Sequence, residues 1–159
     1  MPLKAVIFDL DLTLIASEAA DQHRRKRDWQ RVYRMVPDLT PYEGVTELIG
    51  WLREHGIKVA VVTSSPRPYC TRIVQHWGWH VDAMVCYHDT TKKKPHPDPI
   101  LKALDNLRIL PRDAIAIGDA PGDIISAKSA GVFAIAALWG IGDHVCKTVV
   151  ELVSYVEAQ

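Results

Sequence analysis

Five short runs, apolar except for Lys4 and Lys58, constrain the fold of this chain more than any other feature of its sequence. They are Leu3–Phe8, Ile57–Val62, Ala83–Tyr87, Ala114–Ile117 and Val132–Ala137. Runs of this kind, rather than runs that alternate with polar residues, are typical of strands that are covered on both faces of a parallel sheet. A chain with these runs therefore needs helices on both sides of one sheet.

Segments with apolar residues at helical spacing lie between these runs, and residues that start or stop helices mark their ends. Ser65-Pro66 and Asp98-Pro99 are typical helix starts, and Gly56 and Gly78 are typical helix stops. A last amphipathic stretch covers Val149–Val156. The alternation predicts an α/β fold, a three-layer α/β/α sandwich around a mostly parallel, Rossmann-like sheet of about five strands.

Length and composition exclude several classes of protein. The 159 residues fit a single domain, which we expect to span 1–159. Lysine plus arginine and aspartate plus glutamate both number 19, so no net charge favours a nucleic acid or a membrane as partner. Three cysteines without CxxC spacing predict neither a zinc site nor a disulfide framework. Without a spanning segment or a signal-peptide pattern, the expected compartment is the cytoplasm.

Residues able to bind a phosphate or a metal ion gather where four of the predicted strands end. In chain order they are Asp9, Asp11 and Thr13, then Thr63 and Ser64, then Lys94, and finally Asp119 and Asp123. The carboxyl ends of parallel strands meet at one edge of a sheet, and such folds bind their ligands at that edge. We therefore expect these side chains to converge on one site.

The chemistry of this set indicates a phosphoryl group as the ligand. The four aspartates would repel one another unless a cation lay between them. Oxygen ligands without histidine or cysteine favour Mg²⁺ over zinc. Thr63 and Ser64 precede a helix whose first N–H groups can bind an anion, and Lys94 adds a compact positive charge. Only a phosphoryl group would be bound by all of these groups together: carboxylates that hold a cation, backbone amides and a lysine.

Four strings of the chain resemble, in order, the motifs of the haloacid dehalogenase (HAD) superfamily. FDLDLTL at 8–14 is similar to its DxDxT motif, and VVTSS at 61–65 is similar to its strand that ends in threonine or serine. KKPHPDP at 93–99 is similar to its lysine motif, and IGDAPGDIISAKSAG at 117–131 to its GDxxxD motif. The resemblance implies an HAD-like fold and a phosphatase-type hydrolase.

The resemblance also implies how the chemistry is divided among these residues. Asp9 would be the nucleophile that forms an aspartyl-phosphate. Asp11 would be the general acid and base, which protonates the leaving group and then activates water. Thr63 and Lys94 would bind the transferring phosphate, together with the backbone amide of Ser64.

The metal site that the resemblance implies is built from carboxylates. Asp9, Asp119 and the backbone carbonyl of Asp11 would hold Mg²⁺. Asp123 would either bind the ion as well or support one of its ligands, and Thr13 would support the loop. The residue between the first two aspartates is leucine, where many phosphatases of this family carry glycine, and we expect it to shape the approach of the substrate.

The segment 18–41 stands where many HAD enzymes carry a larger helical cap. Its string HRRKRDWQRVYR at 23–34 predicts one helix with a turn or two beyond it, ending before Pro37. One helix cannot close a lid, so we expect an open site. The arginines of this segment either rim the entrance or form a solvated helix face, and the acidic residues among them favour the solvated face. They are Arg24, Arg25, Arg27 and Arg31.

We therefore predict Mg²⁺-dependent hydrolysis of a small phosphomonoester through an aspartyl-phosphate. One alternative is the same chemistry on a macromolecule, either a phosphoprotein or a nucleic-acid 3′-phosphate, because an open site admits bulky substrates; the nucleic acid is not favoured. The other alternative is a non-catalytic HAD-fold binding scaffold, against which the intact motifs argue. The sequence leaves the oligomeric state and the identity of the substrate open.

Overall fold

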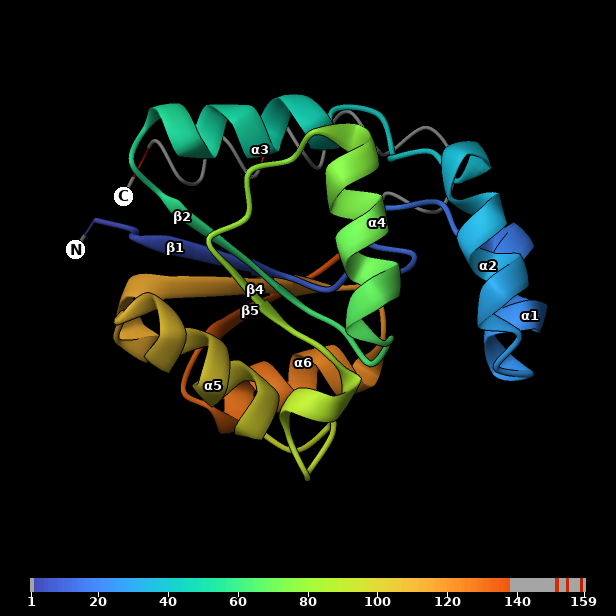
Figure 1. Ribbon diagram of the computed structural model, residues 1–159. Coiled ribbons are helices and arrows are strands. Elements are labelled where there is room, and N and C mark those ends of the chain that lie inside the picture. The colour runs from blue at the N-terminus through green and yellow to red at the C-terminus, as the bar shows by residue number, and fades with distance from the viewer. Residues whose placement is uncertain (1, 138–150, 152–153, 155–157, 159) are drawn as a thin grey trace.

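A computed structural model describes residues 2–137 together with residues 151, 154 and 158. Its centre is a five-stranded parallel sheet with the strand order β3-β2-β1-β4-β5 (Figure 1). The strands are β1 (Ala5–Phe8), β2 (Lys58–Val62), β3 (Ala83–Val85), β4 (Ala114–Gly118) and β5 (Phe133–Ala136). Because β1 pairs with both β2 and β4, the end of β1 lies in the middle of the sheet edge.

Helices cover both faces of this sheet, with α3 and α4 over one face and α5 and α6 over the other (Figure 1). The described helices are α1 (Glu18–Arg25), α2 (Trp29–Met35), α3 (Val45–Glu54), α4 (Arg67–Trp77), α5 (Asp98–Leu107) and α6 (Pro121–Ser129). The prediction of a three-layer α/β/α sandwich is confirmed, and every strand pair among the described residues is parallel.

The apolar run of β1 is divided between two hydrophobic cores. Val6 and Phe8 belong to the core beneath α3 and α4, whereas Ala5 and Ile7 belong to the core beneath α5 and α6. Successive side chains of a strand point to opposite faces, so a strand between two helical layers needs an apolar residue at every position. Because both cores hold β1, the position of the next residue, Asp9, is restricted as well.

The segment between β1 and α3 forms two α-helices and a short 3-10 helix (Val36–Asp38), so the single helix predicted over 23–34 is wrong. α1 ends at Arg25, the chain turns at Arg27 with a φ of +57°, and α2 begins after Asp28. The Asp28 carboxylate accepts a hydrogen bond from the Arg31 N–H and so caps α2. The run of charged residues at this turn gave no apolar periodicity from which the break could be predicted.

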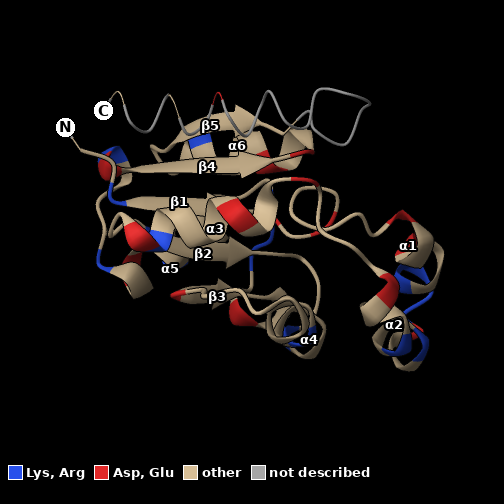
Figure 2. Cartoon of the chain, turned by 90° about the horizontal axis from the view of Figure 1, so that it is seen from above, with Lys and Arg blue, Asp and Glu red and all other residues tan. Residues whose placement is uncertain are grey.

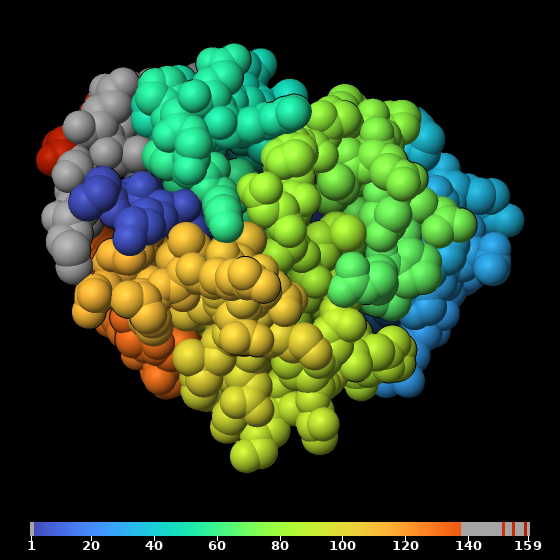
Figure 3. All heavy atoms as spheres, turned by 60° about the vertical axis from the view of Figure 1, so that its left-hand side comes forward, coloured from blue at the N-terminus to red at the C-terminus, as the bar shows by residue number. Residues whose placement is uncertain are grey.

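These two helices lie beyond the carboxyl ends of the strands (Figures 1 and 2). They sit beside α4 on the surface of the molecule (Figure 3), where the Trp29 and Tyr69 rings are 6.0 Å apart. The Arg72 guanidinium lies 4.1 Å from the centre of the Tyr33 ring. Lysine and arginine residues gather on α1 and α2 (Figure 2), so the basic segment stands at the same end of the molecule as the strand ends.

The C-terminal part of the chain is described only in part. The amphipathic helix expected over Val149–Val156 falls largely outside the described residues. Among the helices that the structure describes, none has the length and the apolar character needed to span a membrane.

The two phenylalanines of the chain provide a matched test of this packing. Phe8 is completely buried, whereas Phe133 on the edge strand is 58% exposed. We expect Phe8→Ala to lower the free energy of unfolding by about 3–5 kcal/mol, because it leaves a cavity in the core. Phe133→Ala should lower it by less than about 1 kcal/mol. Chemical denaturation checks both values, and equal losses would contradict the assignment of β1 to the centre of the sheet.

Candidate active site

The predicted site residues meet at the carboxyl edge of the sheet, around a cavity of about 260 Å³. The loop after β1, the loop after β2, the loop before α5 and the start of α6 each contribute to it. The predicted residues that line the cavity are Asp9, Asp11, Thr63, Ser64, Lys94 and Asp123. Thr13 and Asp119 lie directly beside it, since the Thr13 hydroxyl hydrogen-bonds to Asp9 and to Asp119.

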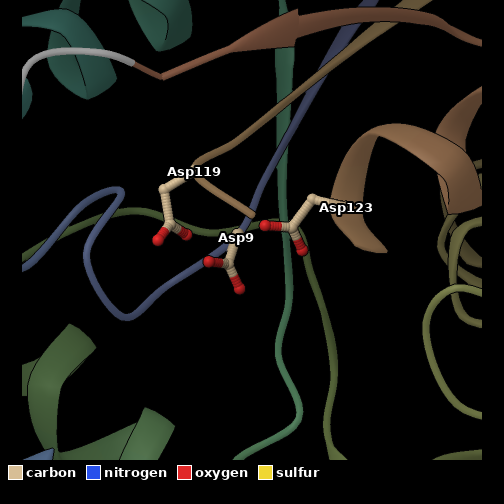
Figure 4. Close-up of side chains that lie close together, drawn as sticks. All are labelled: Asp9, Asp119 and Asp123. Atoms are coloured by element: carbon tan, nitrogen blue, oxygen red, sulfur yellow. The ribbon is translucent and has the colours of Figure 1, made fainter. Parts of the chain in front are cut away.

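Three carboxylates of this group point toward one another, as Figure 4 shows. One oxygen each of Asp9, Asp119 and Asp123 lies within 4.8 Å of the other two. Asp123 is held in this position by the start of α6, because its second oxygen accepts a hydrogen bond from the Ala120 N–H at 3.1 Å. A set of oxygen ligands at this spacing fits a hard divalent cation such as Mg²⁺.

A buried lysine joins two of these carboxylates. The Lys94 ammonium donates to Asp9 Oδ1 at 3.0 Å, to Asp123 Oδ1 at 2.6 Å and to the Val62 carbonyl at 2.8 Å. Burial acts to lower the pKa of Lys94, but the two carboxylates outweigh burial and hold that pKa above its ordinary value. The lysine therefore stays charged, with each of its three N–H groups in use.

The charge of Lys94 does not balance the carboxylates around it. Burial raises the pKa of Asp9 to about 8, with Lys94 acting against this rise and Asp123 adding to it. The site thus carries more negative charge than one ammonium can stabilise. A bound cation would supply the missing positive charge, so the electrostatics and the ligand set both fit a site that could hold a metal ion.

Gly118 at the end of β4 makes this geometry possible. A Cβ atom at this position would lie 2.3 Å from the Cβ atom of Asp123, far inside van der Waals contact. The glycine of the GDxxxD string is therefore needed so that α6 can bring Asp123 against the end of the strand. Gly122 in the same string has no such neighbour, since its nearest atom would be the Cβ of Lys94 at 4.0 Å.

The loop after β1 is tight and supports the first carboxylate. The Thr13 hydroxyl lies 3.2 Å from Asp9 Oδ2 and 3.2 Å from Asp119 Oδ1, so it links the ends of β1 and β4. Leu12, which lines the cavity, has a φ of +63°, a conformation that costs a residue with a side chain about 1–2 kcal/mol. Many members of the family that the chain resembles carry glycine at this position.

The Asp11 carboxylate is held by three donors and not by the carboxylate cluster. Tyr69 donates to its Oδ1 at 2.7 Å, Ser65 donates to its Oδ2 at 3.0 Å, and the Arg24 guanidinium lies 3.0 Å from the same oxygen. Burial and the neighbouring Asp11 raise the pKa of Tyr69, which keeps its hydroxyl a donor. The carboxylate of Asp11 is thus not placed among the metal ligands, and a contribution through its backbone carbonyl stays a prediction.

Sequence reasoning missed these three partners of Asp11. For Arg24 the favoured interpretation, a solvated helix face, is wrong, because only 20% of its side chain is exposed, although Arg25 beside it is 79% exposed. The sequence pattern predicts Ser65 only as a helix start. The sequence held no usable signal for Tyr69, because Ser65 lies before the N-cap of α4 and does not share a helix face with Tyr69.

The residues expected to bind phosphate lie at the cavity in two different environments. Thr63 is buried, and its hydroxyl accepts a hydrogen bond from the Ser65 N–H at 3.0 Å. Ser64 is exposed and lines the cavity wall. Their contact with a phosphate stays a prediction.

Comparison with known proteins identifies relatives over most of the chain. The family model of the haloacid dehalogenase-like hydrolases matches residues 18–137. The PpaX protein of Caldanaerobacter subterraneus subsp. tengcongensis is 44% identical over 101 residues, which are 62% of this chain and 46% of that protein. The phosphoglycolate phosphatase of Xylella fastidiosa is 32% identical over 106 residues, 65% of this chain and 46% of that protein. The chain thus spans about half the length of these relatives.

A solved structure shows the same fold at lower sequence identity. The crystal structure of CbbY from Rhodobacter sphaeroides in complex with phosphate has a TM-score of 0.74 and is 19% identical in sequence. The match covers 90% of each chain.

Two glycines four residues apart test how the site is packed. Gly118→Ala should lower the free energy of unfolding by about 1–3 kcal/mol, because the new methyl group displaces Asp123. Gly122→Ala, inside α6, should change it by no more than about 1 kcal/mol, and in the stabilising direction. Thermal and chemical denaturation measure both variants. Equal tolerance at the two positions would show that the close approach of β4 and α6 is not required.

Proposed function

The chain belongs to the haloacid dehalogenase-like hydrolase family, and on that premise we propose that it hydrolyses a phosphomonoester with Asp9 as the nucleophile. The observation that carries this proposal is the fixed position of the Asp9 carboxylate at the cavity. Lys94 holds one of its oxygens and Thr13 holds the other. A carboxylate whose two oxygens are both held by hydrogen bonds and that faces a cavity is positioned for attack on a ligand there.

The first step transfers the phosphoryl group to the enzyme. An Asp9 oxygen forms a bond to phosphorus while the bond from phosphorus to the leaving oxygen breaks. Asp11, two residues further along the same loop, delivers a proton to the leaving oxygen. Lys94 stands beside the attacking oxygen, where its positive charge stabilises the charge that develops on the phosphoryl group.

The second step releases phosphate. Asp11, now without its proton, accepts a proton from a water molecule, whose oxygen attacks the phosphorus of the aspartyl-phosphate. The bond between phosphorus and the Asp9 oxygen breaks, inorganic phosphate leaves and the Asp9 carboxylate is regenerated. Asp11 ends the cycle protonated, as it began.

We propose Mg²⁺ as the ion of this site. Asp9 and Asp119 would hold it together with the backbone carbonyl of Asp11, and Asp123 stands close enough to serve as a further ligand. When bound, the ion would neutralise phosphoryl oxygens and orient the phosphate for in-line attack. The proposal rests on the all-oxygen ligand set and on the excess of negative charge around Lys94.

The proposed substrate is a small phosphorylated molecule. One relative is named a phosphoglycolate phosphatase, and the cavity of about 260 Å³ has the size for a compact phosphate ester. We propose the cytoplasm as the place of reaction, since the two cysteines that the structure describes, Cys70 and Cys86, are free thiols.

Replacement of the nucleophile tests the covalent mechanism. Asp9→Asn should fold and lose essentially all turnover of p-nitrophenyl phosphate, because an amide does not attack phosphorus. The raised pKa of Asp9 implies that a neutral side chain is tolerated there, so the variant should keep its stability. Asp105→Asn, on the exposed side of α5, removes the same charge and should keep full activity. Substantial turnover by Asp9→Asn would end the assignment of Asp9 as the nucleophile.

Removal of the metal tests the second part of the proposal. A chelator should abolish turnover, Mg²⁺ should restore it, and Ca²⁺ should restore it poorly, because its larger and looser shell does not orient the phosphate equally well. Asp119→Asn should raise the Mg²⁺ concentration needed for half-maximal activity by at least about tenfold. Unchanged rates in excess chelator would show that these carboxylates do not serve a metal.

A further inference from the structure

Three sulfur atoms meet beneath α4, and the proposed reaction uses none of them. Cys70 lies in the first turn of α4, and Cys86 directly follows β3. The Cys70 thiol hydrogen-bonds to Cys86, and its Sγ atom lies 3.5 Å from the Sδ atom of Met84. Both cysteines are buried in the same hydrophobic core, and both are free thiols. The fold therefore holds two reduced thiols in direct contact.

The two thiols of this pair differ in their surroundings. The hydrogen bond from Cys70 lowers the pKa of Cys86, and the charge of Arg67 lowers it further against the effect of burial. The Arg67 guanidinium is fixed close by, since it donates to the Met84 carbonyl at 2.9 Å. The same hydrogen bond, together with burial, raises the pKa of Cys70. Because the thiolate is the reactive form of cysteine, Cys86 is the nucleophile of the pair.

A small oxidant has a route to Cys86 from the active site. Cys86 lines a space of about 10 Å³ together with Thr63, Ser64 and Lys94. The same three residues line the cavity of about 260 Å³ at Asp9, so the two spaces are neighbours. A space of about 10 Å³ holds roughly one water molecule. It therefore favours hydrogen peroxide, which is not much larger than water, over bulky oxidants.

We propose that Cys86 and Cys70 form a peroxide-sensitive thiol pair, which closes to a disulfide and lowers turnover at the neighbouring active site. The Cys86 sulfur attacks one oxygen of hydrogen peroxide, the O–O bond breaks, and the departing hydroxide takes up a proton to become water. The Cys70 sulfur then attacks the resulting sulfenic acid, the S–O bond breaks, and the oxygen leaves with the Cys70 proton as a second water. The pair gives up two electrons, and the peroxide accepts them. Thiols of low molecular weight reverse the reaction by exchange, so the bond is transient in a reducing compartment.

The disulfide would displace two of the side chains that hold Asp11. Cys70 follows Tyr69, whose hydroxyl donates to Asp11 at 2.7 Å. The residue after Cys86 donates its N–H to the carbonyl of Ser65, whose hydroxyl also donates to Asp11. The sulfur atoms of a disulfide lie about 2.0 Å apart, closer than two thiols in hydrogen-bond contact, so its formation draws both segments together. The loss of turnover rests on the proposed function, whereas the formation of the disulfide does not.

Oxidation of the protein with hydrogen peroxide tests the inference. We would use a Cys146→Ser background, which leaves Cys70 and Cys86 as the only cysteines of the chain. Peroxide in small molar excess should remove two hydrogen atoms from the intact mass, and a digest without reductant should contain the Cys70 and Cys86 peptides joined. Turnover of p-nitrophenyl phosphate should fall by at least about tenfold, because small displacements of catalytic groups have effects of this size. Dithiothreitol should restore both the mass and the turnover.

Single substitutions separate the roles of the three sulfur atoms. Cys70→Ala should stop at a sulfenic acid on Cys86, which dimedone traps when the protein is unfolded, and it should keep its turnover. Cys86→Ala should stay unmodified at Cys70, because the nucleophile of the pair is missing. Met84→Leu is the matched control: it removes the third sulfur atom at nearly constant volume and should form the disulfide as the background protein does.

Three results would overturn the inference. The first is a peroxide-treated protein in which both thiols can still be alkylated. The second is a joined pair with unchanged turnover. The third is an equal loss of turnover in Cys70→Ala, Cys86→Ala and the background protein, which would place the damage elsewhere in the chain. A reduced protein without turnover would count against the proposed function instead, and the mass measurement would still decide whether the pair closes.

Discussion

The buried ammonium of Lys94 is the interaction on which the rest of this structure depends. It connects Asp9 after the central strand, the carbonyl of Val62 at the end of β2 and Asp123 in α6, so three separate segments are joined at one atom. Removing the ammonium from such an ion pair typically costs about 3–5 kcal/mol, since its carboxylate partners are left as uncompensated charges. The contact of Lys94 with Asp9 also orients the proposed nucleophile, so it serves both the stability of the fold and the proposed reaction.

The residues around Lys94 bring together more carboxylates than its single positive charge can neutralise. The parallel sheet brings the ends of β1 and β4 side by side, and Gly118 removes the Cβ atom that would keep Asp123 away. Burial first, and the neighbouring carboxylates second, raise the pKa of Asp9. Without ligands such a site is only partly stabilised. Binding of a cation and a phosphate would stabilise it further.

Periodicity and topology were sufficient to predict the sandwich and to bring eight polar residues to one edge, because the direction of each strand follows from its burial on both faces. Periodicity and topology did not predict the contacts that long side chains make between segments. The pairing of Arg24 with Asp11 joins α1 to the loop after β1, and Arg24 lies in a charged stretch without apolar periodicity. The contacts of Tyr69 and Ser65 with Asp11 likewise join α4 and the loop before it to the loop after β1, and no local sequence pattern indicates them.

Detection of the phosphorylated enzyme is the most direct test of the central claim, that Asp9 is the group that receives the phosphoryl. Asp11→Asn protein would be mixed with a good phosphoryl donor and Mg²⁺, quenched in acid within milliseconds and digested for mass spectrometry. Without the base for the second step, the intermediate should accumulate, and the peptide that contains Asp9 should gain the mass of one phosphoryl group. Release of phosphate with no such gain on that peptide, or a gain on a different residue, would contradict the account.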